Sequence, residues 1–108
     1  MAAHESLNKT LFHGTAGGLE GGVVKPTEAV HGFGAYATPN MDMAQRFARD
    51  QAEKEGRLFG TVYEVSPMGK GVERPYKFGT TEYVDPKGLK ANKIVDFPIP
   101  GQIDLDTV

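Results

Sequence analysis

The chain has 108 residues, a formal net charge of −2 and 39% hydrophobic residues, which suits one soluble globular domain spanning residues 1–108. It contains no cysteine, which excludes a disulfide framework, a thiolate metal site and a cysteine nucleophile. Its 14 glycines and 7 prolines favour short strands and loops over a helical bundle.

Targeting signals and a nucleic-acid footprint are both missing from the sequence. No apolar run approaches the roughly 20 residues that span a bilayer, and the N-terminus lacks the basic and apolar regions of a signal peptide. We therefore expect a cytoplasmic protein. Basic residues are scattered, which favours a protein or small-molecule partner over nucleic acid. His4 and His31 have no metal-ligand spacing with His13, so we expect no metal site.

In chain order, residues 1–9 are polar and residues 10–13 predict a short strand that Gly14 ends. Residues 15–32 are rich in glycine and predict a loop with at most one helical turn, near residues 27–30. A long, weakly structured stretch inside a small domain is often functional. A second short strand is expected around Tyr36.

The main helix is predicted from Thr38, as the N-terminal cap, and Pro39, at the first helical position. Gly56 is expected to end it. The stripe that faces the core has spacings of three and four and comprises Met43, Ala44, Phe47, Ala48, Gln51 and Ala52.

The second half of the chain predicts three strands, at residues 58–65, 81–84 and 92–97. Residues 68–80 read as a loop, residues 85–88 as a turn and residues 98–108 as an extended tail. The predicted fold class is therefore α+β, with a dominant β component and one main helix.

Three residues carry candidate chemistry. A lone histidine is more often structural than catalytic, but His13 lies at a strand end beside Gly14, whose missing Cβ would let a ligand approach the backbone. Thr15 adds a hydroxyl. Tyr36 lies among small residues, where a flat heteroaromatic ligand could stack on its ring, although tyrosines on short strands usually pack in the core.

A carboxylate completes the set. Glu82 starts a predicted strand that could pair near the His13 strand. Such carboxylates are normally solvated, but one that faces a cleft could stabilise positive charge developing on a sugar carbon, as in glycoside cleavage. Glu73, in the predicted loop, could reach the same place.

Two other classes of site are excluded. Residues 17–22 match neither the Walker phosphate loop nor the dinucleotide-binding glycine spacing. The only serines, Ser6 and Ser66, lie outside an elbow motif, which excludes a serine hydrolase.

Taken in order, these segments resemble the ADP-ribosyltransferase fold of the diphtheria-toxin-like branch, with its His–Tyr–Glu triad. Residues 12–15 (Phe-His-Gly-Thr) resemble its first motif, and residues 34–37 with the following helix resemble its second. Residues 81–84 are similar to the third motif of the poly-ADP-ribose polymerases. Residues 11–28 and 36–67, including Glu55-Gly56-Arg57, look closer to the small bacterial rifamycin ADP-ribosyltransferases. Those enzymes carry the third acidic residue in the loop after the long strand, where this chain has Glu73.

The resemblance implies a split β-sheet core with one main helix, NAD as co-substrate and no metal. It implies catalytic roles for His13, Tyr36 and Glu82, and NAD binding by His13, Gly14, Thr15 and Tyr36. His13 would bond a ribose hydroxyl, Gly14 would hold the nicotinamide amide and Tyr36 would stack on the nicotinamide ring. Glu82 would bind the 2′-hydroxyl of the nicotinamide ribose and stabilise the oxocarbenium-like transition state.

The function expected from this resemblance is mono-ADP-ribosylation of an acceptor that the sequence does not identify: a protein, a small molecule or a nucleic acid. One alternative is NAD-dependent removal of an RNA 2′-phosphate, for which Arg46, Arg57 and Arg74 are candidate phosphate ligands. Another is a non-catalytic binding or structural module on the same fold, within a larger assembly such as a viral particle. The oligomeric state stays open.

Overall fold

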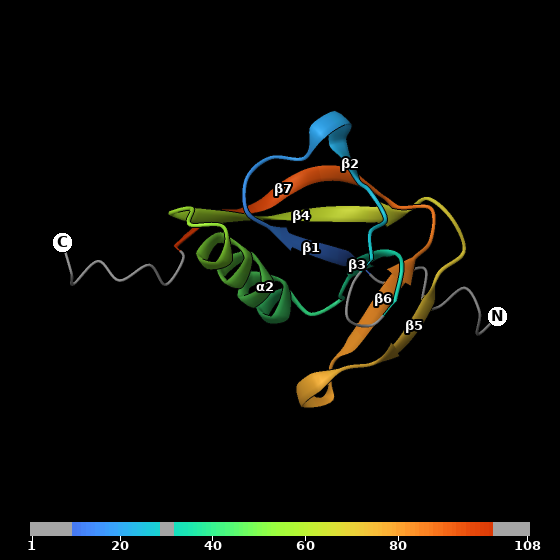
Figure 1. The fold of residues 1–108 in the computed structure, drawn as a ribbon. Helices are drawn as coiled ribbons and strands as arrows, with labels where there is room; N and C mark the ends of the chain where they lie inside the picture. Colours follow the sequence, from blue (N-terminus) through green and yellow to red (C-terminus); the bar gives the residue numbers. More distant parts are fainter. Residues whose placement is uncertain (1–9, 29–31, 101–108) are drawn as a thin grey trace.

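Two antiparallel sheets meet at strand β1 (Leu11–Thr15) in the computed structural model, which describes residues 10–28 and 32–100. The larger sheet has the strand order β1-β4-β7-β2 and the smaller sheet the order β3-β6-β5 (Figure 1). The remaining strands are β2 (Val23–Val24), β3 (Ala35–Ala37), β4 (Phe59–Pro67), β5 (Val72–Pro75), β6 (Thr81–Asp85) and β7 (Leu89–Pro100). Among the described residues there is one α-helix, α2 (Met41–Lys54), so the predicted α+β class is confirmed. Two short 3₁₀ helices, η2 (Glu20–Gly22) and η3 (Lys77–Gly79), lie in the connections.

Helix α2 begins later than the sequence predicted. Its cap is Asn40, whose side-chain oxygen accepts a hydrogen bond from the Met43 backbone N–H at 2.9 Å. Thr38 is not the cap, because it is buried in a bridge to Phe12 of β1 and donates its hydroxyl to the Thr81 carbonyl.

The C-terminal end of α2 follows the prediction. Gly56 adopts a positive φ of 68°, and its N–H donates to the Glu53 carbonyl while the Arg57 N–H donates to the Ala52 carbonyl. These two bonds form a Schellman motif, for which glycine is the favoured residue.

The larger sheet is apolar on both faces. One face packs against α2, and Figure 1 shows the helix below one end of this sheet, with the smaller sheet beyond the other. The core between helix and sheet contains Ala44, Ala48, Val62 and Ile99. The opposite face packs against the smaller sheet through Leu11, Val24, Ala35, Ala37, Val65, Tyr83 and Leu89.

The predicted loops contain more regular structure than expected. Residues 15–32 hold η2 and β2, and Thr27 forms a β-bridge with Gly34 where a helical turn was expected. Residues 68–80 hold β5 and η3, and β7 extends from Leu89 to Pro100, well beyond residues 92–97. The predictions for residues 1–9, 29–30 and 101–108 lie outside the described residues.

Candidate functional site

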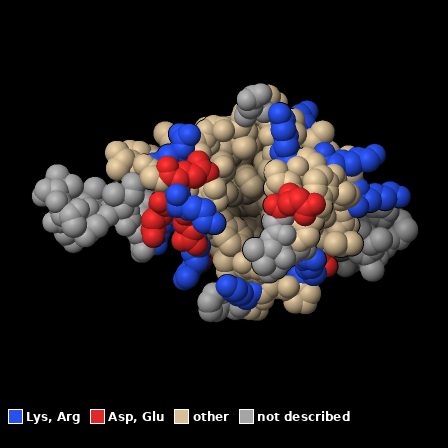
Figure 2. Space-filling model, viewed as in Figure 1, with Lys and Arg blue, Asp and Glu red and all other residues tan. Residues whose placement is uncertain are grey.

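A groove with two lobes runs beside β1. Figure 2 shows a hollow at the centre of the side of the molecule that it draws, with charged side chains around the rim of the hollow. The first lobe encloses about 480 Å³ and the second about 490 Å³. The first is lined by His13, Gly14, Thr15, Gly18, Leu19, Val23, Val24, Lys25, Thr27 and Gln51. The second is lined by His13, Gly14, Tyr36, Phe47, Asp50, Gln51, Lys54, Tyr76, Lys77 and Glu82.

The three predicted catalytic residues all line the second lobe, although they come from three strands. His13 lies on β1, Tyr36 on β3 and Glu82 on β6. Of the predicted NAD-binding residues, His13 and Gly14 border both lobes, Tyr36 borders the second and Thr15 borders the first. Every residue of the predicted His–Tyr–Glu and NAD-binding set therefore borders one of the two lobes.

His13 ties the two sheets together. Its Nδ1 lies 2.7 Å from the carbonyl oxygen of Tyr36. Because a carbonyl only accepts, Nδ1 must carry the proton, which leaves Nε2 of the neutral ring as a hydrogen-bond acceptor. Burial lowers the pKa of His13 below its ordinary value of 6.5, while the bond to Tyr36 acts in the opposite direction. The ring is therefore held in the neutral form at neutral pH.

Gly14 is explained by packing rather than by ligand access. A Cβ built on it would lie 2.0 Å from the Ala44 carbonyl oxygen and 2.7 Å from the Ala48 nitrogen, both in the backbone of α2. Gly60, on neighbouring β4, meets the same helix, with its Cβ position 2.5 Å from the Ala48 oxygen. The helix thus occupies the side where a Cβ would lie, while Gly14 itself still borders both lobes.

Tyr36 is half-buried and its ring forms part of the second lobe. Its hydroxyl donates to the carbonyl of Gly32, and its own carbonyl accepts from His13. Gly34 beside it has a φ of 156°, and a Cβ there would lie 2.4 Å from Val84. The small residue near Tyr36 therefore serves the contact between β3 and β6.

Glu82 reaches the groove through β3, not through a direct pairing with β1. Strand β6 pairs with β3 and β5, and Thr38, which follows β3, forms a bridge to Phe12 of β1, so β6 lies near the His13 strand as expected. Since side chains alternate along a strand, Tyr36, which pairs with Val84, lies on the same face of the smaller sheet as Glu82. Glu82 is 5% exposed, and its Oε2 lies 3.3 Å from both Nε and Nη2 of Arg74.

Glu73 lies on the other face of the same sheet. It pairs with Tyr83, one position out of phase with Glu82, and its carboxylate accepts a bond from the Thr81 hydroxyl at 3.2 Å. It does not line either lobe. The loop expected around Glu73 is in fact strand β5, and its register directs Glu73 away from Glu82.

Sequence reasoning missed six of the ten residues that line the second lobe. Phe47 and Tyr76 form an edge-to-face aromatic pair with ring centroids 5.8 Å apart, and the Lys77 ammonium lies 6.0 Å from the centre of the Tyr76 ring. From α2, Asp50 and Lys54 also line the lobe, although neither belongs to the predicted core-facing stripe. A signal was present, because Phe47 and Gln51 are four residues apart and share a helix face.

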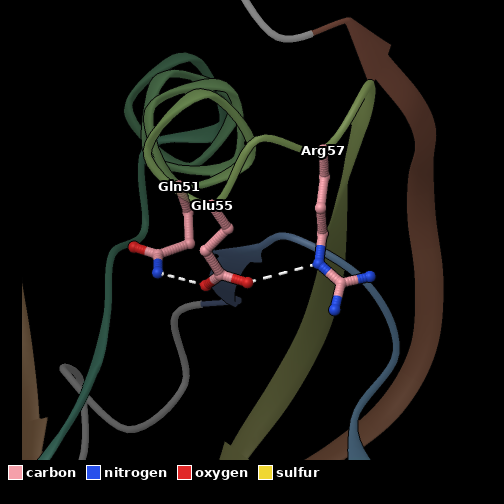
Figure 3. Close-up of polar contacts among 3 residues, drawn as sticks. All are labelled: Gln51, Glu55 and Arg57. Atoms are coloured by element: carbon pink, nitrogen blue, oxygen red, sulfur yellow. Dashed lines mark hydrogen bonds and ion pairs between the residues drawn. The ribbon is translucent and has the colours of Figure 1, made fainter.

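Three polar side chains at and just beyond the end of α2 are linked to one another (Figure 3), and one of them, Gln51, lines both lobes. Gln51 donates through Nε2 to Glu55 at 2.5 Å, and Arg57 donates through Nε to the other Glu55 oxygen at 3.3 Å. The bond from Gln51, followed by the charge and bond of Arg57, lowers the pKa of Glu55. Arg57 also lies against Gly17, whose Cβ position would be 3.4 Å from Nη1. The Glu-Gly-Arg segment therefore connects the end of the helix to the loop after β1.

Comparison with known proteins gives no family: no family model, no curated protein and no solved structure matches the chain. Within residues 10–28 and 32–100, no three histidine, aspartate or glutamate side chains cluster as metal ligands would. The described part of the chain also holds no helix with the length and apolar character needed to cross a membrane.

Proposed function

We propose that the chain is an NAD-dependent mono-ADP-ribosyltransferase. The observation that carries the proposal is that His13, Tyr36 and Glu82, from three strands, line one lobe of one groove. The two lobes share the lining residues His13, Gly14 and Gln51 and have nearly equal volumes. Two adjacent cavities of this size suit a ligand with two halves, and NAD is such a ligand.

The nicotinamide half would occupy the second lobe. Tyr36 offers its ring face to the pyridinium, and the neutral His13 offers Nε2 to a ribose hydroxyl. The adenosine half would occupy the first lobe against Leu19, Val23 and Val24.

Glu82 would stabilise the charge that develops during the reaction. The bond between C1′ of the ribose and N1 of nicotinamide breaks, and its electron pair neutralises the pyridinium. The positive charge moves to the sugar, where a nearby carboxylate lowers the barrier. The acceptor then forms a bond to C1′ and loses its proton to solvent. Water is the acceptor when no other is bound.

The RNA 2′-phosphate alternative has less support. It needs several arginines around a phosphate, and none of Arg46, Arg57 and Arg74 lines either lobe. A non-catalytic module on the same fold would leave the second lobe without turnover, and the experiment below distinguishes it.

The test is nicotinamide release from NAD by the full chain, compared with its Glu82→Gln and Glu73→Gln variants. Glu73 is the matched control, because it is a carboxylate on the same sheet but on the opposite face. We expect Glu82→Gln to reduce release by about 10²- to 10³-fold, the usual loss when one group that stabilises transition-state charge is removed. Glu73→Gln should retain activity. The reverse pattern would assign the chemistry to Glu73, and no release or NAD binding by any version would reject the transferase.

A further inference from the structure

Arg74 is the charged partner of the candidate catalytic carboxylate. Arg74 on β5 and Glu82 on β6 are direct partners in the register of the smaller sheet, so both side chains leave the same face. Two nitrogens of one guanidinium, Nε and Nη2, each lie 3.3 Å from Oε2 of Glu82. The sequence singled out Arg74 only as a phosphate ligand in an alternative function.

Burial explains why Glu82 needs such a partner. The Glu82 side chain is 7% exposed, whereas that of Arg74 is 38% exposed. A carboxylate removed from water is stable in its charged form only when it is paired and hydrogen-bonded. A guanidinium satisfies this requirement with a planar set of donors that also fixes the orientation of the carboxylate.

Only one of the two residues borders the second lobe. Glu82 lines the second lobe, whereas Arg74 is not among its lining residues. A ligand in the lobe would therefore meet the carboxylate and not the guanidinium. Arg74 would therefore act on the reaction through Glu82.

We propose that Arg74 is a positioning residue that holds the Glu82 carboxylate in a fixed orientation toward the second lobe. This inference rests on the proposed function and adds to it a residue outside the resembled triad. Arg74 contributes to the transition state rather than to NAD binding, so its loss should lower kcat and leave KM nearly unchanged. Lysine is a poor substitute, because one ammonium cannot occupy the positions of both Nε and Nη2.

The test compares wild type with Arg74→Met, Arg74→Lys and, as a control, Arg46→Met, an arginine on the exposed side of α2. For Arg74→Met we expect kcat for nicotinamide release to fall roughly 10- to 100-fold with KM for NAD within about twofold of wild type, since misplacing a reacting group costs on this order. Added guanidinium chloride at millimolar concentration should recover part of the loss in Arg74→Met. The kcat of Arg74→Lys should lie between those of Arg74→Met and wild type, and the kcat of Arg46→Met should match wild type.

A second readout does not depend on turnover. The Nε–H resonance of Arg74 in a ¹H–¹⁵N spectrum should shift in Glu82→Gln, because the charged acceptor is removed. Wild-type kcat in a folded Arg74→Met variant would overturn the inference and leave the proposed function intact. A loss of kcat with a matching rise in KM and no recovery by guanidinium would also overturn it, since that pattern indicates a structural role. An inactive wild type would reject both proposals, even if the Arg74 resonance responds.

Discussion

The two lobes of the groove share His13, Gly14 and Gln51 but differ in what else lines them. The first lobe adds small and aliphatic residues and a single charged one, Lys25. The second adds two further aromatic rings besides Tyr36, and four charged residues: Asp50, Lys54, Lys77 and Glu82. Under the proposed function, the first lobe would supply binding by shape and the second would supply the chemistry.

The largest effect should come from Gly14, one of the three residues common to both lobes. Gly14→Ala would place a methyl group 2.0 Å from the Ala44 carbonyl oxygen, so helix and sheet must separate. We expect the free energy of unfolding to fall by about 3 kcal/mol, at the upper end of ordinary overpacking. Denaturant unfolding measures this. The control is Gly18→Ala, whose Cβ would meet only the Tyr63 hydroxyl, at 3.9 Å. Equal stability of the two variants would contradict the close packing of α2 on β1.

Removing the Tyr36 ring from the second lobe should reduce turnover. Tyr36→Leu removes the stacking surface, which is worth about 1–3 kcal/mol for a base on an aromatic ring, so kcat/KM for NAD should fall roughly tenfold or more. Tyr36→Phe keeps the ring and loses only the bond to Gly32, so it should stay close to wild type. Steady-state kinetics of nicotinamide release measure both. Equal losses in the two variants would show that the hydroxyl, not the ring face, is what matters.

Filling the first lobe should affect binding alone. Gly18 lines this lobe and has room for a Cβ, so we expect Gly18→Val to narrow the lobe while the core stays intact. We expect KM for NAD to rise about fivefold with kcat unchanged, the signature of lost uniform binding. A fall in kcat at constant KM would instead indicate that the reacting half of NAD binds in the first lobe, which would contradict the proposal.

The smallest effect concerns pH. Because burial lowers the pKa of His13 in the folded chain, the unfolded chain binds a proton more readily as pH falls below 6.5. The contribution of neutral His13 to stability is complete above pH 6.5 and declines on acidification. His13→Gln should therefore lose less stability than wild type between pH 6.5 and pH 5, measured by denaturant unfolding in both. A parallel decline in the two proteins would show that His13 is not desolvated.

Local signals predicted the helix and most strands, while long-range pairing decided the rest. The end of α2 could be read from Gly56, because the Schellman motif depends on nearby residues. Strand β5 could not be predicted from local signals, because its four residues become a strand only by pairing with β6. The same holds for Thr38, whose partner Phe12 is far away in sequence.

The candidate site shows the same limit. His13, Tyr36 and Glu82 could be chosen from residue type and order, but their meeting in one lobe required the pairing of β3 with β6 and its bridge to β1. Neither Arg74 nor Tyr76 had a sequence signal for this site. Both enter it through the position of β5 and the connection that follows it.

The most direct test of the groove as a dinucleotide site is a ¹H–¹⁵N titration of Glu82→Gln with NAD, since this variant should bind without consuming the ligand. The division of the groove predicts shifts at backbone amides in both lobes: Thr15, Gly18 and Val24 in the first, and Tyr36, Tyr76 and Lys77 in the second. Adenosine monophosphate alone should shift the first group, and nicotinamide alone the second. An NAD titration that leaves both groups unmoved, or that shifts residues elsewhere, would contradict the groove as the NAD site.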